Sequence, residues 1–200
     1  MSVDFKEKEE NKYYKNKSIV RIKRSLECKL YSKFIKGESR YMIVSLCDNS
    51  TSKIVLSKFK ENCEKIGVDY VIYNSGEKGY SKVNKPVLFN YVLKKYKRNI
   101  AYIDINTKIN RDPKLFNVKN MDFMTINLDN TNIQSSVCSD MRILKTLNDN
   151  LYFFAYNSVV LDFMSIWLEN NKYMKYQHKS LEYAFNISLS INKLRCYWLP

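Results

Sequence analysis

The sequence predicts an α/β protein: a single domain with a mostly parallel sheet flanked by helices. Two apolar runs, residues 41–47 and 68–73, enclose a segment with helical spacing, and a right-handed crossover makes such strands parallel. A third run, residues 100–103, is apolar almost throughout, as expected of a buried central strand, and ends abruptly in Asp104-Ile105-Asn106. With 200 residues and 45% hydrophobic content, the chain is long enough for one sizeable core.

The first 40 residues are expected to form a basic N-terminal extension ahead of a domain spanning residues 41–200. The spacing of Ile22, Leu26, Leu30 and Phe34 among lysines and arginines predicts an amphipathic helix over residues 18–36. A helix that covers the domain with a solvated basic face is one interpretation. Contact with a membrane surface, a partner or nucleic acid is the other.

The helix of the strand-helix-strand unit is expected over residues 52–66, after a polar strand exit and before Gly67, with its apolar residues on one face: Ile54, Val55, Phe59, Cys63 and Ile66. Residues 74–84 contain two of the four glycines and predict a loop able to fold over a ligand. A second helix begins near Pro86, which suits a first helical turn, and leads into the central strand.

Further elements follow Asp104. Residues 121–128 predict a strand, and residues 129–140 a polar connection long enough to line an acceptor cleft. Residues 151–156 predict another strand, and residues 157–170 a capped helix that buries Trp167. The chain ends in an apolar segment, residues 194–200, that predicts a last strand.

The composition excludes several classes of protein. The five cysteines are widely spaced and include no Cys-x-x-Cys pair, so a disulfide framework or a zinc site is not expected. No apolar run reaches the roughly 20 residues that span a bilayer, and the first 30 residues lack the apolar centre of a signal peptide. We therefore expect a soluble protein of the cytoplasm, either of its own cell or of a host cell.

The net charge of +14 indicates an anionic partner or a solubilising surface. Lysine greatly outnumbers arginine, and Asn, Ile and Tyr are abundant, which is typical of an A+T-rich genome. Most of the excess charge lies in the first 100 residues. Nucleic-acid binding is the less favoured interpretation, because no stacking platform or recognition motif of known spacing accompanies the charge.

The order of helix, apolar strand, Asp104-Ile105-Asn106 and then Arg111-Asp112-Pro113-Lys114-Leu115-Phe116 resembles the GT-A glycosyltransferases, which use nucleotide sugars. In that family a strand-end Asp-x-Asp motif holds a divalent cation on the donor diphosphate. The resemblance implies that Asp104 and Asn106 bind Mn²⁺ or Mg²⁺. Asn106 replaces the second acid, and an amide oxygen can bind such a cation without contributing charge.

The same resemblance implies the other site residues. It assigns donor binding to Ser45, Asp48 and Asn49 after the first strand, and to Lys85, Asp104, Arg111 and Asn150. It assigns catalysis to Gln177 and His178, in the place where the family has a carboxylate followed by a helix. Ordinary roles remain open for each of them: a strand exit or helix cap for Asp48, a surface position for Lys85, and a cap for His178, the single histidine.

The resemblance implies metal-assisted transfer of a sugar from a nucleotide-diphosphate sugar to a hydroxyl of a glycan or protein acceptor. The first alternative is a degenerate GT-A-like protein that binds or has a structural role without catalysis, which Asn106 and Gln177 favour. The second alternative is a basic nucleic-acid-binding protein.

Overall fold

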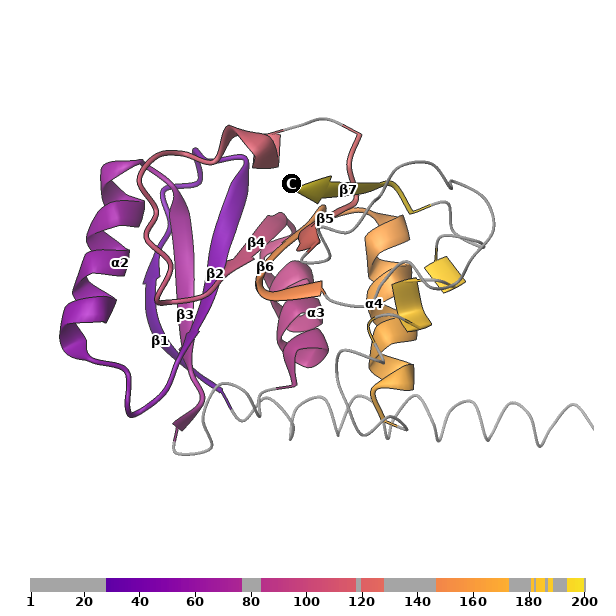
Figure 1. Ribbon diagram of the computed structural model, residues 1–200, viewed down its shortest axis with the longest axis horizontal. Helices are drawn as coiled ribbons and strands as arrows, with labels where there is room; N and C mark the ends of the chain where they lie inside the picture. The colour runs from indigo at the N-terminus through magenta and orange to yellow at the C-terminus, as the bar shows by residue number, and fades with distance from the viewer. Residues whose placement is uncertain are drawn as a thin grey trace, which may run out of the picture.

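The computed structural model describes residues 28–76, 84–117, 120–127, 147–172, 181, 183–185, 187–188 and 194–199. Within these residues the chain forms one seven-stranded sheet with helices against it (Figure 1). The elements occur in this order: β1 (Lys29–Phe34), β2 (Tyr41–Cys47), α2 (Lys53–Lys65), β3 (Asp69–Asn74), α3 (Lys85–Tyr96), β4 (Asn99–Ile103), the short 3₁₀ helix η3 (Lys114–Asn117), β5 (Phe123–Asn127), β6 (Leu147–Phe154), α4 (Ser158–Asn170) and β7 (Cys196–Leu199).

The strand order is β1-β3-β2-β4-β6-β5-β7. The predicted strand-helix-strand unit is confirmed, because β2 and β3 are parallel, and β2 and β4 are parallel as well. The sheet is nevertheless mixed rather than mostly parallel. β6 lies between β4 and β5 and runs antiparallel to both, and β1 runs antiparallel to β3. β7 is parallel to β5 at the other end of the sheet.

The prediction of a helix over residues 18–36 is wrong for the second half of that range. Lys29–Phe34 is a strand, so the sheet begins upstream of residue 41. The strand is stabilised by its pairing with β3 and by Phe34, whose ring stacks on Tyr70 at 5.8 Å. The helical spacing of the apolar residues is outweighed by this cross-strand contact, which the local pattern does not show. Residues 18–27 lie outside the described part of the chain.

The helices begin as the sequence predicts. The side chains of Ser52, Asn84 and Asn157 cap α2, α3 and α4 by accepting a backbone N–H of the first turn. α2 lies on one face of the sheet, and α3 and α4 lie on the other (Figure 1). All seven residues of β2 are buried, as expected of a strand covered on both faces. Ile54 was expected on the buried face of α2 but is 67% exposed.

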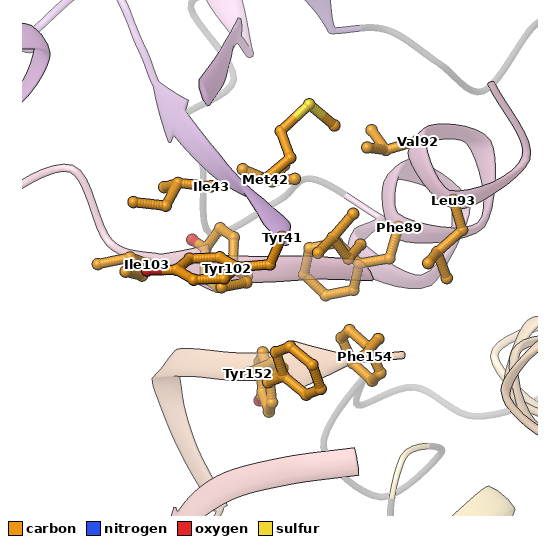
Figure 2. Close-up of a cluster of buried hydrophobic side chains, with 14 of the residues drawn as sticks. Tyr41, Met42, Ile43, Phe89, Val92, Leu93, Tyr102, Ile103, Tyr152 and Phe154 are labelled. Atoms are coloured by element: carbon orange, nitrogen blue, oxygen red, sulfur yellow. The ribbon is translucent and has the colours of Figure 1, made fainter. Parts of the chain in front are cut away.

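The core between the sheet and α3 is aromatic. Figure 2 shows Phe89 of α3 beside Tyr102 of β4, with Tyr152 and Phe154 of β6 next to them. The ring centroids of these three residues lie 5.2, 6.1 and 5.3 Å from that of Phe89. Trp167 of α4 closes the cluster at 6.1 Å from Phe89. The burial of Trp167 is thus confirmed. Packing of this kind fixes α3 and α4 against β4 and β6.

Two expectations from composition can be compared with the structure. Four of the five cysteines are described, namely Cys28, Cys47, Cys63 and Cys196, and all four are free thiols. In the described part of the chain, no helix has the length and apolar character needed to cross a membrane.

Candidate functional site

The candidate site lies along the edge of the sheet where β2, β3 and β4 end, which we call the carboxyl edge. The chain passes from β2 to β3 on one side and then returns to β4 on the other side of β2. The strand order therefore reverses between β2 and β4. In open α/β sheets the crevice outside the carboxyl ends of the strands at such a reversal is the usual ligand site.

Ser45 lies at this reversal but faces the interior. It is completely buried, and its hydroxyl donates a hydrogen bond to the carbonyl oxygen of Ile103 at 2.8 Å. The ladder between β2 and β4 ends one pair earlier, at Val44 and Tyr102. Ser45 therefore holds the end of β4 in place, and its contact with a donor remains a prediction.

Asp48 and Asn49 occupy the exit of β2. Oδ1 of Asp48 accepts hydrogen bonds from the hydroxyls of Ser50 and Thr51 at 2.6 and 3.0 Å. The Ser50 hydroxyl in particular holds the pKa of the Asp48 carboxyl below its ordinary value, against the small opposing effect of burial. The backbone N–H of Asn49 donates to the carbonyl oxygen of Gly76, which ties the β2 exit to the β3 exit. Both residues thus shape the loops at the carboxyl edge.

Asp104 and Asn106 form a turn directly after β4. The backbone N–H and the side-chain amide of Asn106 both donate to Oδ1 of Asp104, at 2.9 and 3.1 Å. The backbone N–H of Thr107 donates to the carbonyl oxygen of Asp104 at 2.9 Å. One carboxylate oxygen is therefore used to build the turn, as in many Asx turns.

This arrangement is a poor cation site by itself. The amide nitrogen of Asn106 faces the carboxylate, and Oδ1 of Asp104 already accepts two N–H groups. Among the described residues no three His, Cys, Asp or Glu side chains cluster where they might hold a metal. Mg²⁺ in phosphate-transferring sites commonly has one or two carboxylate ligands, with phosphates and water completing its shell. Asp104 and Asn106 alone do not supply a protein-held cation with enough ligands or charge.

Lys85 stands at the same edge. α3 ends close to the start of β4 at the opposite edge, so its first residue, Lys85, lies near the strand ends. The ammonium group of Lys85 lies over the rings of Tyr102 and Tyr152, with Nζ 5.2 and 5.8 Å from the ring centroids. Such contacts attract a cation to the faces of the two rings.

Asn150 reaches the edge through the register of β6. Leu151 pairs with Ile103, so Asn150 comes next to the end of β4, where Asp104 follows. Gln177 and His178, the predicted catalytic residues, lie outside the described part of the chain.

Arg111 is not brought to the carboxyl edge. Its neighbour Asp112 accepts a hydrogen bond at 2.7 Å from the hydroxyl of Tyr41, the first residue of β2. Tyr41 and Cys47 mark the two ends of β2, roughly 20 Å apart because a strand rises about 3.3 Å per residue. The segment after Asp104 thus runs back along the sheet. A pocket of about 200 Å³ opens beside Tyr41 and Asp112, on the side away from Asp104.

The opposite edge, which we call the amino edge, carries two buried carboxylates, Asp69 and Asp122. The sequence alone did not predict the ion pairs that they form. Asp69 is fully buried and accepts hydrogen bonds from Arg98 at 2.5 Å and from the backbone N–H of Lys36 at 2.7 Å. Burial alone raises the pKa of the Asp69 carboxyl, but these donors outweigh burial and hold the pKa below its ordinary value.

Asp122 has the same environment next to β5 and β7. Nε and Nη2 of Arg195 donate to its carboxylate at 2.9 and 2.8 Å, and Asn157 donates at 2.7 Å. Burial raises the pKa of the Asp122 carboxyl, and the bonds from Arg195 and Asn157 bring it below its ordinary value. The partners lie far apart in sequence, so no local spacing reveals them. These carboxylates are structural, and the amino edge is internally paired.

No protein-family model matches the sequence, and no curated protein matches it. The structure superposes on the crystal structure of a glycosyltransferase involved in the glycosylation of the major capsid of PBCV-1. The match has a TM-score of 0.52 at 11% sequence identity and covers 80% of this chain and 82% of the other.

The chain shares its fold with a glycosyltransferase. The similarity extends over most of both chains, so it concerns the sheet and its helices together. At this level of identity the match establishes the fold and assigns no role to any residue.

Proposed function

We propose that the protein is a glycosyltransferase that transfers a sugar from a nucleotide-diphosphate sugar to a hydroxyl group of a glycan or protein acceptor. The observation that carries the proposal is the reversal of strand order between β2 and β4, which brings Asp48 and Asp104 to one edge of a sheet whose fold a glycosyltransferase shares. The donor would lie across this carboxyl edge, with its diphosphate near Asp104.

In the proposed reaction, the bond between the anomeric carbon and the diphosphate oxygen breaks, and its electron pair leaves with the nucleoside diphosphate. A bond forms between the acceptor oxygen and the anomeric carbon, and the proton of the acceptor hydroxyl passes to solvent. The protein must hold the two reactants in line and stabilise the charge that develops on the diphosphate. The catalytic roles predicted for Gln177 and His178 remain part of this proposal.

The expected Mn²⁺ or Mg²⁺ also remains a prediction. Bound together with the diphosphate, such a cation would supply positive charge to the leaving group. Asp104, through its second carboxylate oxygen, would contact it. The carbonyl oxygen of Asn106 would add a neutral ligand only if the amide turned away from its bond to Asp104.

A degenerate, non-catalytic domain is the second candidate, and one observation favours it. Asn106 takes the place of an acid and donates to Asp104 instead of adding a charged ligand. Release of nucleoside diphosphate from a panel of nucleotide sugars separates the two functions. An active transferase releases nucleoside diphosphate from one donor, and the release is faster when a hydroxyl acceptor is present. A folded protein that releases none from any donor contradicts the proposed activity.

A further inference from the structure

β1 lies at one end of the sheet. It is first in the strand order and pairs only with β3 among the described residues. The backbone N–H and C=O groups on its other side therefore have no neighbouring strand within the described ranges. Such an edge can pair with an extended segment of another chain, with affinity from main-chain hydrogen bonds and specificity from side-chain contacts. The side chains of β1 thus determine which segment fits.

β1 exposes an apolar side chain on each face of the sheet. Leu30 lies opposite Tyr73, whose ring centroid is 6.5 Å from that of Tyr91 in α3, so Leu30 is on the α3 face. Nζ of Lys60 in α2 lies 5.0 Å from the ring centroid of Tyr31, so Tyr31 is on the α2 face. Leu30 is 42% exposed and Tyr31 is 46% exposed. A strand added at the edge contacts the neighbouring side chains on both faces. This placement therefore fits an added strand better than a flat surface laid against one face.

β1 is also basic. Lys29 and Lys33 are exposed, and the strand contains no acidic residue. Neither lysine forms an ion pair within the described part of the chain. Side chains alternate along a strand, so Lys29, which precedes Leu30, is on the α2 face, and Lys33, opposite Val71, is on the α3 face. Each face of β1 thus carries one lysine and one exposed apolar side chain.

The charge of β1 distinguishes a second copy of this chain from a different partner. Pairing of two β1 strands would place Lys29 and Lys33 of one copy near the same lysines of the other. Like charges on paired strands are destabilising, and lysines on an edge strand are a common protection against self-pairing. An acidic segment meets the same lysines with the opposite charge. The edge therefore disfavours a second copy and is complementary to an acidic strand.

We propose that β1 is the docking edge for an extended acidic segment of a partner protein, which adds a further strand to the sheet. The segment carries acidic residues near Lys29 and Lys33 and apolar residues beside Leu30 and Tyr31. The inference does not depend on the proposed function, because β1 contains none of the residues assigned to the donor or to catalysis. The helix that the sequence predicts here offers a basic face alone, whereas a strand also offers its backbone groups.

The test uses fluorescent peptides with blocked ends and about eight residues, a usual strand length. The first repeats Val-Val-Glu-Glu, so that both faces of an extended chain carry both residue types. The second has Lys in place of Glu. The third keeps every Glu but has Pro in place of one Val of each pair, which removes backbone donors and disfavours strand pairing. Fluorescence anisotropy measures binding to the purified protein. Hydrogen–deuterium exchange locates the contact.

The variants are Lys29→Glu and Lys33→Glu, each at an exposed position. Lys114→Glu is the matched control, because Lys114 is also exposed and the charge change is identical. Lys114 belongs to η3, whose Phe116 stacks on Phe153 of β6 at 5.4 Å, and β6 is separated from β1 by three strands of the sheet. Melting temperatures check that each variant is folded.

We expect the Val-Glu peptide to bind and to slow hydrogen exchange in residues 29–34, while the lysine and proline peptides bind much more weakly. Added salt should weaken the binding, because the lysines are exposed. Lys29→Glu and Lys33→Glu should each weaken it by about tenfold, because an attraction between paired strands becomes a repulsion. Lys114→Glu should stay within about twofold of the wild type.

Several results would overturn the inference. Equal binding of the Val-Glu and proline peptides would show a contact through charge alone, without strand addition. No binding of the Val-Glu peptide, or unchanged binding in both β1 variants, would also contradict it. Phosphatidylserine vesicles and poly(U) RNA complete the test. If either one binds through Lys29 and Lys33 and the Val-Glu peptide does not compete, the edge serves a membrane or a nucleic acid instead.

Discussion

The hydroxyl of Ser45 donates a hydrogen bond to the carbonyl oxygen of Ile103 at 2.8 Å, at the point where β2 and β4 stop pairing. This bond joins the two strands whose order reverses at the candidate site. Because Asp104 is the next residue after Ile103, the position of the Asp104 turn depends on it. The buried side chain of Ser45 is thus one of the connections between the site and the core.

Replacement of Ser45 by Ala should lower the free energy of unfolding by about 1–3 kcal/mol, because it leaves a buried carbonyl oxygen without that donor. Urea denaturation followed by circular dichroism measures the change. Ser165→Ala is the control, since Ser165 is exposed on α4 and its hydroxyl also donates to a carbonyl oxygen, that of Leu161 at 2.9 Å. The control should change stability by less than about 0.5 kcal/mol. Equal effects of the two variants would contradict the role of Ser45.

Removal of Arg98 should be strongly destabilising. Arg98→Met removes the charged partner of the Asp69 carboxylate, which is completely buried. Breaking a buried pair in this way costs about 3–5 kcal/mol. The matched control is Lys172→Met, because the ion pair of Lys172 with Glu169 is exposed on both sides and such pairs contribute about 0–1 kcal/mol. Denaturant midpoints of both variants give the comparison. A small effect of Arg98→Met would show that the amino edge is not fixed by this pair.

Stability should depend on pH through Asp69 and Asp122. Both carboxyl pKa values are lower in the folded protein than in the unfolded chain. The stabilisation is therefore fully present above the unfolded value of about 3.9 and is lost as the pH falls through the folded values. We expect these two groups to contribute little change between pH 7 and 5 and a steep loss below about pH 4. Urea unfolding at pH 7, 5 and 3.5 tests this, and Asp69→Asn should flatten the acid limb.

Arg111 and Asp104 should differ in their effect on nucleotide binding, although they are seven positions apart in sequence. Arg111→Ala should leave the dissociation constant of the nucleotide within about twofold of the wild type, because the Tyr41–Asp112 bond holds this segment at the amino edge. Asp104→Asn, which keeps the size of the side chain, should change the dissociation constant of the nucleotide. Calorimetry on both variants measures the two dissociation constants. A large effect of Arg111→Ala would mean that the segment reaches the donor.

The sequence was sufficient for the elements whose signals are local. The strand at residues 41–47, the capped helix after it and the short apolar strand before Asp104 are all confirmed. Their signals are continuous apolar runs and capping side chains, which act within a few residues. The placement of Asp104 at a strand end follows from the same signals.

Features fixed by distant residues were not predictable in this way. Residues 29–34 have helical spacing, yet their pairing with β3 makes them a strand. Arg111 follows the Asp104 turn closely in sequence, yet the bond between Asp112 and Tyr41 takes it to the other edge. β6 lies between β4 and β5 and is antiparallel to both, and the apolar run of residues 151–154 does not indicate the direction of a strand within the sheet. In each case a long-range contact decides what a local pattern leaves open.

The measurement that tests the account most directly is the melting temperature of the purified protein with UDP, GDP and their sugar conjugates, each with EDTA or with MnCl₂. A ligand that binds only the folded state must raise the melting temperature. We predict a shift with one nucleotide and its sugar conjugate, abolished or strongly reduced in Asp104→Ala and retained in Arg111→Ala. No shift with any of these ligands in a folded wild-type sample, or a shift that Asp104→Ala leaves intact, would contradict donor binding at the carboxyl edge.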